Sequence, residues 1–394
     1  MKKINLFYVI LTLTLALGMF FASCEEGAVQ PPEDTGGFRD ISAAELAAGI
    51  TVGWNLGNTL DSHAGTDSSP GVYQSNATVA SLESRWGNNR TSKANIDAIK
   101  AAGFNAIRIP VTWYQCADPD NDYTIRADWM TRVKQVVDYA VSNDMYIFLN
   151  THHDNSIFKL RNADMEESRK AFGSVWRQIS ETFKDYNEKL VFEDLNEPRT
   201  INSQAQWSGG TEEERNNLNA LHQLFVDTVR ATGGNNEKRI LYIPTYAAST
   251  EIPAMSNLEI PDDPLNTKNK IIVSYHAYEP FAFAHNGDGT WTSGNTSPIT
   301  SRADRAYELF VSRGIPVIIG EFGSMYYRRN SPPSSSLVPL ESRVAWSEYY
   351  VAYAKSKGIK CVWWDDGGDF RLLNRNDNSF YYQEIVEALM RGAE

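Results

Sequence analysis

Two glutamates each follow an apolar run directly, which is a costly place for a charge. Glu197 comes shortly after Leu195, and Glu321 comes shortly after Ile319. A carboxylate in such surroundings is tolerated when it lies in an open site with partners. Cleavage of an acetal requires an acid to protonate the leaving oxygen and a base or nucleophile on the other face. Two carboxylates supply both roles, so the pair predicts acetal hydrolysis.

Other chemistries have weaker support in the sequence. His152 and His153 are adjacent, but no His-Glu-x-x-His motif and no cysteine accompany them, so a metal centre is the lesser alternative. A serine hydrolase would need a Gly-x-Ser-x-Gly elbow, which is missing. The formal charge of -12 argues against nucleic acid as a partner. We therefore expect neither a metal nor a cofactor.

The elements that must position these residues are short apolar runs at a steady spacing. Eight runs rich in β-branched and aromatic residues predict strands. They cover residues 51–54, 105–109, 146–150, 190–195, 240–243, 271–275, 316–319 and 360–364. Several are continuously apolar, as expected of a parallel sheet that is buried on both faces.

Most of the predicted strands are separated by stretches with apolar residues at helical spacing. These stretches cover residues 93–102, 128–143, 166–186, 212–232, 301–313 and 343–357. Repeated β-α alternation predicts a single catalytic domain with the α/β fold of a (β/α)8 TIM barrel. A doubly wound open sheet is the alternative, but the segment from Gly53 to Asn58 lacks its glycine-rich phosphate loop.

Polar residues gather at the carboxyl ends of the predicted strands. In a barrel these ends meet at one mouth, where active sites lie. The polar ends are Arg108, His152, His153, Asp154, Asn196, Glu197, His276, Tyr278, Glu321 and the segment from Trp363 to Asp366. Six strands would thus contribute to one site.

Aromatic residues are plentiful, with 10 Trp and 19 Tyr. Those expected in loops, where they could line a cleft or simply pack, are Trp86, Trp113, Tyr114, Trp207, Phe281, Phe283 and Trp291. Rings at a cleft surface can stack on a ligand. The composition leaves the choice between these two roles open at each position.

The start of the chain is typical of an export signal. Lys2 and Lys3 precede an apolar run that ends in Ala22-Ser23-Cys24, and this ending resembles the lipobox of bacterial lipoproteins. An ordinary signal peptide with an incidental cysteine is the alternative. We expect residues 1–23 to be a lipoprotein signal peptide, residues 24–37 a tether, and residues 38–394 the catalytic domain. Cys116 and Cys361 are expected at opposite ends of the barrel and therefore unpaired.

Several motifs resemble glycoside hydrolase family 5, and most closely its subfamily 4. They run in family order across the predicted domain. They are Gly53-Trp54-Asn55-Leu56-Gly57-Asn58-Thr59-Leu60-Asp61, Arg108-Ile109-Pro110-Val111, His152-His153-Asp154, Asn196-Glu197-Pro198-Arg199, His276-Ala277-Tyr278, Gly320-Glu321-Phe322-Gly323 and Trp363-Trp364-Asp365. Subfamily 4 acts on β-1,4-glucans, xyloglucan and mixed-linkage glucan.

The resemblance implies a role for each matching residue. Glu197 would be the acid/base and Glu321 the nucleophile of a retaining double displacement. Arg108 and Tyr278 would keep Glu321 ionised, and Asn196 would bind the sugar 2-hydroxyl. The remaining implied substrate-binding residues are His152, His276, Trp364, which would be the stacking platform, and Asn58. His153 belongs either to this polar floor or to the packing beside it.

The sequence as a whole predicts an endo-β-1,4-glucanase that acts on cellulose-like glucans. We expect a monomer that is exported and lipid-anchored through Cys24 to the bacterial outer membrane or cell surface, with no other membrane contact. Xyloglucan, mixed-linkage glucan, mannan or xylan as the substrate of the same kind of enzyme remains open. A non-catalytic surface glycan-binding protein is the alternative of a different class.

Overall fold

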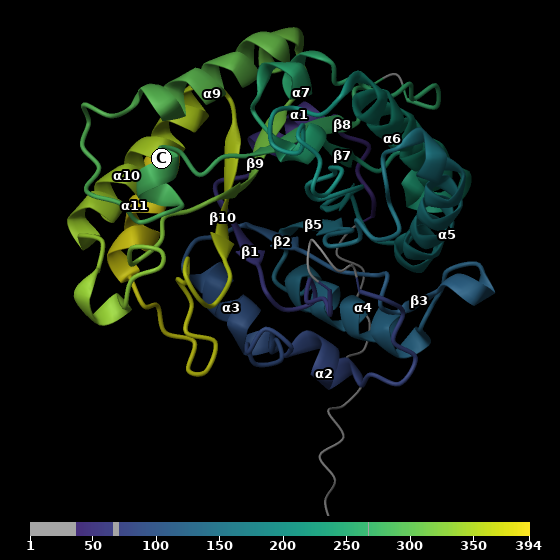
Figure 1. Ribbon diagram of the computed structural model, residues 1–394, viewed down its shortest axis with the longest axis horizontal. Coiled ribbons are helices and arrows are strands. Elements are labelled where there is room, and N and C mark those ends of the chain that lie inside the picture. The colour runs from purple at the N-terminus through teal and green to yellow at the C-terminus, as the bar shows by residue number, and fades with distance from the viewer. Residues whose placement is uncertain (1–36, 66–70, 267) are drawn as a thin grey trace, which may run out of the picture. The chain divides into compact units, whose positions relative to one another are not determined.

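Eight parallel strands form a closed barrel at the centre of the molecule (Figure 1). The computed structural model describes residues 37–65, 71–266 and 268–394. The barrel strands are β1 (Gly53–Leu56), β2 (Ala106–Ile109), β5 (Tyr146–Asn150), β6 (Leu190–Glu193), β7 (Leu241–Pro244), β8 (Ile271–His276), β9 (Val317–Phe322) and β10 (Lys360–Asp365). Their order around the barrel is β1-β10-β9-β8-β7-β6-β5-β2.

Helices follow most of the strands and surround the barrel, as Figure 1 shows. They are α1 (Ala43–Ala48), α2 (Val79–Glu83), α3 (Lys93–Ala101), α4 (Ala127–Val141), α5 (Met165–Phe183), α6 (Glu212–Ala231), α7 (Ile252–Ser256), α8 (Phe281–Ala284), α9 (Ser297–Leu309), α10 (Leu340–Ser356) and α11 (Gln383–Ala393). A short antiparallel pair, β3 (Ala117–Asp118) and β4 (Thr124–Ile125), lies outside the barrel. The predicted (β/α)8 barrel is confirmed.

The inside of the barrel changes from apolar to polar along the strands. Side chains alternate between the two faces of a strand, so every second residue points inward. One inward layer is apolar and consists of Ala106, Phe148, Val191, Tyr242, Ile272, Ile318 and Val362. Two residues further along, the inward positions include Arg108, Asn150 and Glu193. The alternation thus places a polar layer at the carboxyl ends, on top of an apolar one.

Helix α1 packs against the apolar layer of the barrel. Ala43 and Leu46 of this helix belong to the same buried cluster as the inward apolar side chains. The helix begins with a capping box between Ser42 and Glu45, in which each side chain accepts the other residue's backbone N–H. The amino end of the barrel is therefore closed by a defined element, and the carboxyl end remains for the site.

A β-bulge in β9 sets the direction of Glu321. Tyr275 of β8 pairs with Ile319, but the next residue, His276, pairs with Glu321, so Gly320 is the extra residue. A bulge bends the strand and redirects the side chains that follow it. Without it, strict alternation from the inward Ile318 would turn Glu321 toward the helices. The bulge returns this carboxylate to the barrel mouth.

Several sequence predictions need adjusting against the structure. All eight predicted strands are present, with ends that match or differ by up to three residues, but the β3–β4 pair and the helices α1, α2, α7, α8 and α11 were not predicted. Cys116 and Cys361 are both buried and free, as expected. The signal peptide and the tether, apart from Gly37, lie outside the described residues. Among the residues described, no helix combines the length and apolar character that a membrane span needs.

Candidate active site

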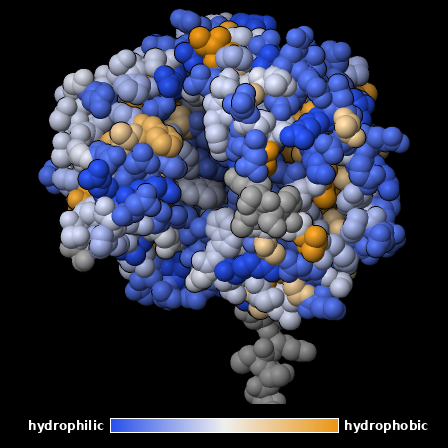
Figure 2. Space-filling view, viewed as in Figure 1, coloured by the Kyte–Doolittle hydropathy of each residue, from blue (hydrophilic) through white to orange (hydrophobic). Residues whose placement is uncertain are grey.

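Glu197 and Glu321 meet across the barrel mouth with His276 between them. The acceptor or donor atoms of these three residues all lie within 4.8 Å of one another. His276 Nδ1 is 3.0 Å from Glu197 Oε1 and 3.6 Å from Glu321 Oε2. The two carboxylates predicted from the sequence are therefore a true pair, although 124 positions separate them in the chain. In Figure 2 the surface is hollowed over the barrel strands.

Glu321 is held by two hydrogen bonds to different oxygens. Arg108 Nη1 donates to Oε1 at 2.8 Å, and the hydroxyl of Tyr278 donates to Oε2 at 2.8 Å. Burial and the charge of Glu321 raise the pKa of Tyr278 well above its ordinary value, so this hydroxyl keeps its proton. Both donors predicted to accompany Glu321 thus contact it. The two hydrogen bonds fix the orientation of the carboxylate.

Glu197 has different partners. Its Oε1 faces His276 Nδ1, and Arg199 Nη1 donates to its Oε2 at 3.2 Å and to its backbone carbonyl at 2.8 Å. Burial alone would raise the pKa of Glu197, but the His276 hydrogen bond and the charge of Arg199 outweigh it and lower this pKa to about 2. Without a ligand Glu197 is therefore a carboxylate, and it must take up a proton as substrate binds before it can act as an acid.

Glu193 is a site residue that the sequence analysis missed. Its two oxygens accept from Arg108 Nε at 2.6 Å and Nη2 at 2.8 Å, and both side chains are fully buried. Such a bidentate pair fixes the guanidinium plane. Burial lowers the pKa of Arg108, but the negative charges of Glu193 and Glu321 outweigh burial. The pKa is therefore raised above its ordinary value. Position 193 is an inward position of β6, so strict alternation along this strand was the available signal.

Asn196 is oriented by the same arginine. Arg108 Nη2 donates to Asn196 Oδ1 at 2.7 Å, which leaves the amide NH2 group pointing elsewhere. Asn196 is buried beside the catalytic pair, and its amide can donate to a ligand. This is the property that the predicted contact with a sugar hydroxyl requires.

The rings of His152 and Trp364 lie parallel to each other. Their ring centroids are 5.8 Å apart, with 4° between the planes. Asn150 Oδ1 accepts the backbone N–H of Val111, so its amide nitrogen donates to His152 Nδ1 at 3.2 Å. Burial lowers the pKa of His152 well below its ordinary value. The neutral ring therefore carries its proton on Nε2 and is a donor there.

The ring of Trp364 also requires a glycine in the β1 loop. A Cβ on Gly57 would lie 2.8 Å from Cη2 of Trp364. No side chain fits in that gap, so the loop after β1 can approach the indole only at a glycine. This explains one glycine of the Gly53-to-Asp61 motif in physical terms.

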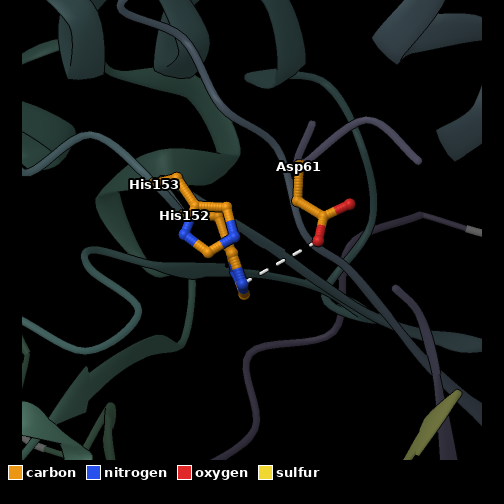
Figure 3. Close-up of side chains that lie close together, drawn as sticks. All are labelled: Asp61, His152 and His153. Carbon is orange, nitrogen blue, oxygen red and sulfur yellow. Dashed lines mark ion pairs between the residues drawn. The ribbon is translucent and has the colours of Figure 1, made fainter. Parts of the chain in front are cut away.

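Asp61, His152 and His153 form a second cluster beside the catalytic pair (Figure 3). His152 Nε2 lies 4.0 Å from Asp61 Oδ2, too far for a hydrogen bond. Asp61 accepts the backbone N–H groups of Thr59 at 2.6 Å and Asn58 at 3.0 Å. Its carboxylate is thus already used to close the β1 loop. A carboxylate with two imidazoles is a possible metal-ligand set, but here the carboxylate serves the backbone.

Asn58 and His153 have defined contacts at this cluster, and the contact of Asn58 with substrate stays a prediction. Asn58 adopts a left-handed backbone conformation with φ 54°, and its carbonyl accepts from Asn88 at 2.9 Å. The ring of His153 packs against those of His63, at 4.5 Å, and Trp86, at 5.4 Å, and the latter two rings also contact each other at 5.4 Å. Burial lowers the pKa of His153 to about 3. The structure brings Asn58 to the mouth through its backbone contacts.

The loop aromatics divide clearly by exposure. Trp113, Tyr114, Phe283 and Trp291 are buried and pack in the core. Trp86, Trp207 and Phe281 are 38%, 57% and 52% exposed. Only these three of the seven present an open ring face. A pocket of about 380 Å³ also opens beside the pair, with His63, Tyr114, His153, Arg161 and Arg199 among its lining residues.

Known proteins are similar to this chain in sequence and in structure. The family model "Cellulase (glycosyl hydrolase family 5)" matches residues 70–369. The Cellulase/esterase CelE of Acetivibrio thermocellus is 43% identical over 91% of this chain, and Endoglucanase A of Clostridium longisporum is 41% identical over 89%. This chain spans 41% and 66% of the lengths of those two proteins.

A solved structure is also similar over nearly its whole length. It is described as a GH5-4 broad specificity endoglucanase from Ruminococcus champanellensis with bound cellotriose. It is 40% identical to this chain and superposes with a TM-score of 0.82, covering 90% of this chain and 99% of its own.

Proposed function

The chain belongs to the cellulase family, glycosyl hydrolase family 5, and from that premise we propose that it is an endo-β-1,4-glucanase. The observation that carries the proposal is the pair Glu197 and Glu321, held within 4.8 Å across the barrel mouth beside His276. The indole of Trp364 packs against Tyr278, whose hydroxyl donates to Glu321. The names of its relatives, which include endoglucanases and a cellotriose complex, support glucan as the substrate.

We further propose that hydrolysis retains the configuration of the anomeric carbon. Carboxyl groups about 5–5.5 Å apart suit a direct nucleophile, whereas inverting enzymes leave about 6.5–9.5 Å for a water molecule. One oxygen of Glu197 and one oxygen of Glu321 lie within 4.8 Å of each other, which supports the shorter arrangement. In the first step a Glu321 oxygen bonds to the anomeric carbon while the glycosidic bond breaks, and Glu197 gives its proton to the leaving oxygen. In the second step water attacks, Glu197 takes its proton, and the ester to Glu321 breaks.

The surrounding residues would act on the sugar that reacts. Asn196 would donate its amide to the 2-hydroxyl, a contact that strengthens as positive charge develops at the anomeric carbon. His152 would donate from Nε2, and Trp364 would stack under the ring. Arg108 and Tyr278 would keep Glu321 anionic until it attacks. Each role follows from the donor or ring face that the geometry leaves available.

Reducing-sugar release from carboxymethyl cellulose tests the proposal. Glu197→Gln and Glu321→Gln keep the size of each side chain and are expected to lower the rate by at least about 10³-fold. Proton NMR of the first product should show the β-anomer. Glu197→Ala should regain most of its first-step rate on 2,4-dinitrophenyl β-cellobioside, because that leaving group needs no proton. Unchanged release in both Gln variants would instead indicate a glycan-binding protein.

The preferred polymer is a second question within the same family. The words "broad specificity" in the description of the similar structure favour more than one β-glucan as substrate, and xyloglucan and mixed-linkage glucan are the candidates. Initial rates on xyloglucan, barley β-glucan, carboxymethyl cellulose and mannan distinguish these possibilities. We expect the three glucans to be cleaved and mannan to be the poorest substrate, because its axial 2-hydroxyl would face Asn196 differently. A rate on mannan above all glucans would contradict the glucanase proposal.

We also propose that the protein is exported, lipid-anchored through Cys24 and monomeric. The basic start, apolar run and Ala-Ser-Cys ending support the anchor. Wild-type protein expressed in a Gram-negative host should fractionate with membranes, and Cys24→Ala should release it into the soluble fraction. Equal membrane association of the two would contradict the anchor. Size-exclusion chromatography of residues 38–394 tests the oligomeric state.

A further inference from the structure

The barrel carries a concentration of cations at its amino end, opposite the catalytic mouth. The chain as a whole has an excess of acids, with 37 Lys and Arg against 49 Asp and Glu. The seven residues before each of the strands β7, β8, β9 and β10 reverse this balance, since they hold seven cations and one acid, Glu237. The cations are Lys238, Arg239, Lys268, Lys270, Arg313, Lys355 and Lys357, and Lys360 follows as the first residue of β10.

The four strands are neighbours in the barrel, so the turns before them form one continuous face. Their order along this part of the barrel is β10-β9-β8-β7, and they pair in parallel, so each of these turns lies at the same end. Arg239 and Lys270 are buried within the fold. The other six cations are exposed or partly exposed, and we call them the basic face: Lys238, Lys268, Arg313, Lys355, Lys357 and Lys360.

The cations of the basic face lie close enough to affect one another. Burial lowers the pKa of Lys360, and the neighbouring charge of Lys355 lowers it further. Lys357 is paired with Asp304 at 2.6 Å, whereas Arg313 is exposed at the turn before β9. Like charges therefore gather here, and an anionic partner would relieve their repulsion.

The start of the folded domain is attached to the same face. Asp40 lies 2.6 Å from the Nζ atom of Lys270 and 3.2 Å from that of Lys238, and these contacts lower the pKa of Asp40 to about 2. The backbone N–H of Ala43 donates to the carbonyl of Asn269 at 2.9 Å. Residues 40–43 are therefore fixed against the turn before β8. Any anchor that precedes them in the chain is joined to the barrel at its amino end.

We propose that the basic face rests on the anionic phosphate headgroups of a membrane, and that the catalytic mouth consequently points away from that membrane. The proposal rests on the endoglucanase function and the Cys24 anchor proposed above. It adds a second membrane contact to the anchor, where the sequence analysis expected none.

The distribution of charge selects this orientation. Lys and Arg side chains are attracted to an anionic bilayer, and the attraction falls off within a Debye length, about 8 Å at physiological ionic strength. A protein with a formal charge of -12 is repelled when its acidic surfaces approach the bilayer, and it is attracted when the basic face leads. An anchor keeps the local concentration high, so a weak attraction is enough to orient the domain. A polysaccharide can then reach the mouth from the side away from the membrane.

The first experiment measures sedimentation of residues 25–394 with lipid vesicles. All the helices and strands lie within residues 43–393, so this chain contains the whole fold and lacks the lipid. It should bind vesicles with about 30% phosphatidylglycerol in phosphatidylcholine at least about tenfold more tightly than pure phosphatidylcholine. About 0.5 M NaCl should release it. Absence of binding to the anionic vesicles would overturn the proposal.

A matched pair of triple variants locates the contact. Lys268→Gln, Arg313→Gln and Lys355→Gln together should weaken binding to the anionic vesicles at least about tenfold. The control removes the same charge from α4 and α5, with Lys134→Gln, Lys170→Gln and Arg177→Gln, and should bind within about twofold of wild type. Equal losses in the two triple variants would overturn the basic face.

Cleavage of barley β-glucan shows whether the triple variants are folded. Both should retain the wild-type rate, because none of the six residues lies at the catalytic mouth. If the basic-face triple variant lacks this activity, Arg313→Gln alone decides, with an expected loss of vesicle affinity of at least about threefold. An unchanged affinity of that variant would overturn the proposal.

The second experiment tests the orientation in the full lipid-modified protein on the same anionic vesicles. A fluorophore is placed on Ser312→Cys, in the turn before β9, or on Ser335→Cys, in the loop after β9. Cys116 and Cys361 are buried, so they do not compete for the label. A quencher on the lipid headgroups should act at least about twofold more strongly at position 312, because about 20 Å of strand separates the two ends of the barrel. Equal quenching at the two positions would overturn the orientation.

An anionic polysaccharide is a different class of partner for the same charges. Affinities of residues 25–394 for soluble polygalacturonate and for the anionic vesicles are compared at the same salt concentration. Tighter binding to the vesicles supports the membrane. Tighter binding to polygalacturonate would assign the basic face to polysaccharide and overturn the proposal.

The failure of this inference differs from the failure of the proposals on which it rests. If the wild-type protein cleaves no β-glucan, the endoglucanase proposal is wrong. If Cys24→Ala stays with cell membranes after a wash with about 0.5 M NaCl, which weakens electrostatic contacts, the anchor is wrong. If the protein cleaves β-glucan and needs Cys24 for salt-resistant membrane association, but residues 25–394 do not bind anionic vesicles, only the role of the basic face is wrong.

Discussion

The hydroxyl of Tyr278 is the group that holds one carboxylate oxygen of Glu321 in place. It donates to Glu321 Oε2 at 2.8 Å, while Arg108 donates to the other oxygen. Burial raises the pKa of Tyr278, so the hydroxyl stays a donor throughout the working pH range. In the proposed retaining mechanism, one of these oxygens becomes part of an ester when Glu321 attacks. The hydroxyl is therefore most useful before attack and again when the ester breaks.

Tyr278→Phe should lower kcat without large changes in stability. A hydrogen bond to a charged group contributes about 1.5–3 kcal/mol, which corresponds to roughly tenfold to 150-fold in rate. The matched control is Tyr353→Phe, whose hydroxyl also donates to a carboxylate, Asp304, at 2.8 Å, but between helices on the outside. Steady-state kinetics on carboxymethyl cellulose compare the two. Equal kcat values for both variants would contradict the role of this hydroxyl.

The sequence allowed individual site residues to be predicted only where a motif or a strand end indicated them. Glu197, Glu321, Arg108 and Tyr278 were predicted, and the structure brings them together. Glu193 was missed because alternation along β6 places its side chain inside the barrel but does not indicate that it will meet an arginine from β2. The exposed rings could not be separated from the buried ones, because burial depends on which loops pack over each other. The residues next to each ring in the sequence do not indicate how the loops pack.

At the scale of elements, the bulge in β9 is the feature on which the site depends. Gly320 is its extra residue, and a Cβ there would lie 2.9 Å from Ser274 Oγ, 3.0 Å from His276 Nε2 and 3.1 Å from Tyr242 Oη. These atoms are buried and close on one side of the backbone. A glycine thus both permits the bulge and lets His276 approach the strand. The strand pattern predicted β9 but could not predict a local change of register.

Gly320→Ala should displace Glu321 and lower kcat at least about tenfold, because a shift of about 1 Å in a catalytic group can cost about 10² in rate. Overpacking should also destabilise the fold by about 1–3 kcal/mol. Gly53→Ala is the control, since its Cβ would lie 2.9 Å from Val362 in the apolar layer. Gly53→Ala should destabilise the fold by a similar amount to Gly320→Ala. At temperatures where it is folded, it should keep the kcat of the wild type. Ser274→Ala combined with Gly320→Ala should restore part of the rate.

For the whole molecule, the strand and helix order was predictable because each signal was local. Apolar runs of four to six residues alternate with amphipathic stretches, and parallel strands with helical crossovers close in only a few ways. The β3–β4 pair escaped because two-residue strands leave no periodic pattern. Helix α11 lies after the last predicted strand and was not assigned, although it packs against α10 and completes the outer layer.

His152, which is buried, and His153, which is half-buried, make the stability of the protein depend on pH. Burial lowers the pKa of His153 to about 3, and it lowers that of His152 as well. In the unfolded chain a histidine titrates near 6.5. Below that pH the unfolded state binds more protons than the folded state, so the free energy of unfolding falls as pH decreases from about 6.5 toward 3. Above about 6.5 this contribution is fully present and constant.

His153→Gln should therefore flatten the pH dependence of unfolding. The variant lacks the proton that His153 binds in the unfolded state but not in the folded state. The slope of the unfolding free energy against pH is therefore reduced by up to about 1.4 kcal/mol per pH unit between pH 6 and 5. Urea unfolding at pH 7, 6 and 5 measures this, and the difference in unfolding free energy between variant and wild type should move in favour of the variant at lower pH. Trp86→Phe is the control, because it alters the same ring cluster, 5.4 Å from His153, without removing a titrating group. Parallel pH profiles for His153→Gln and wild type would mean that His153 titrates normally in the folded protein, and that its burial is relieved by water reaching the ring from the adjoining pocket.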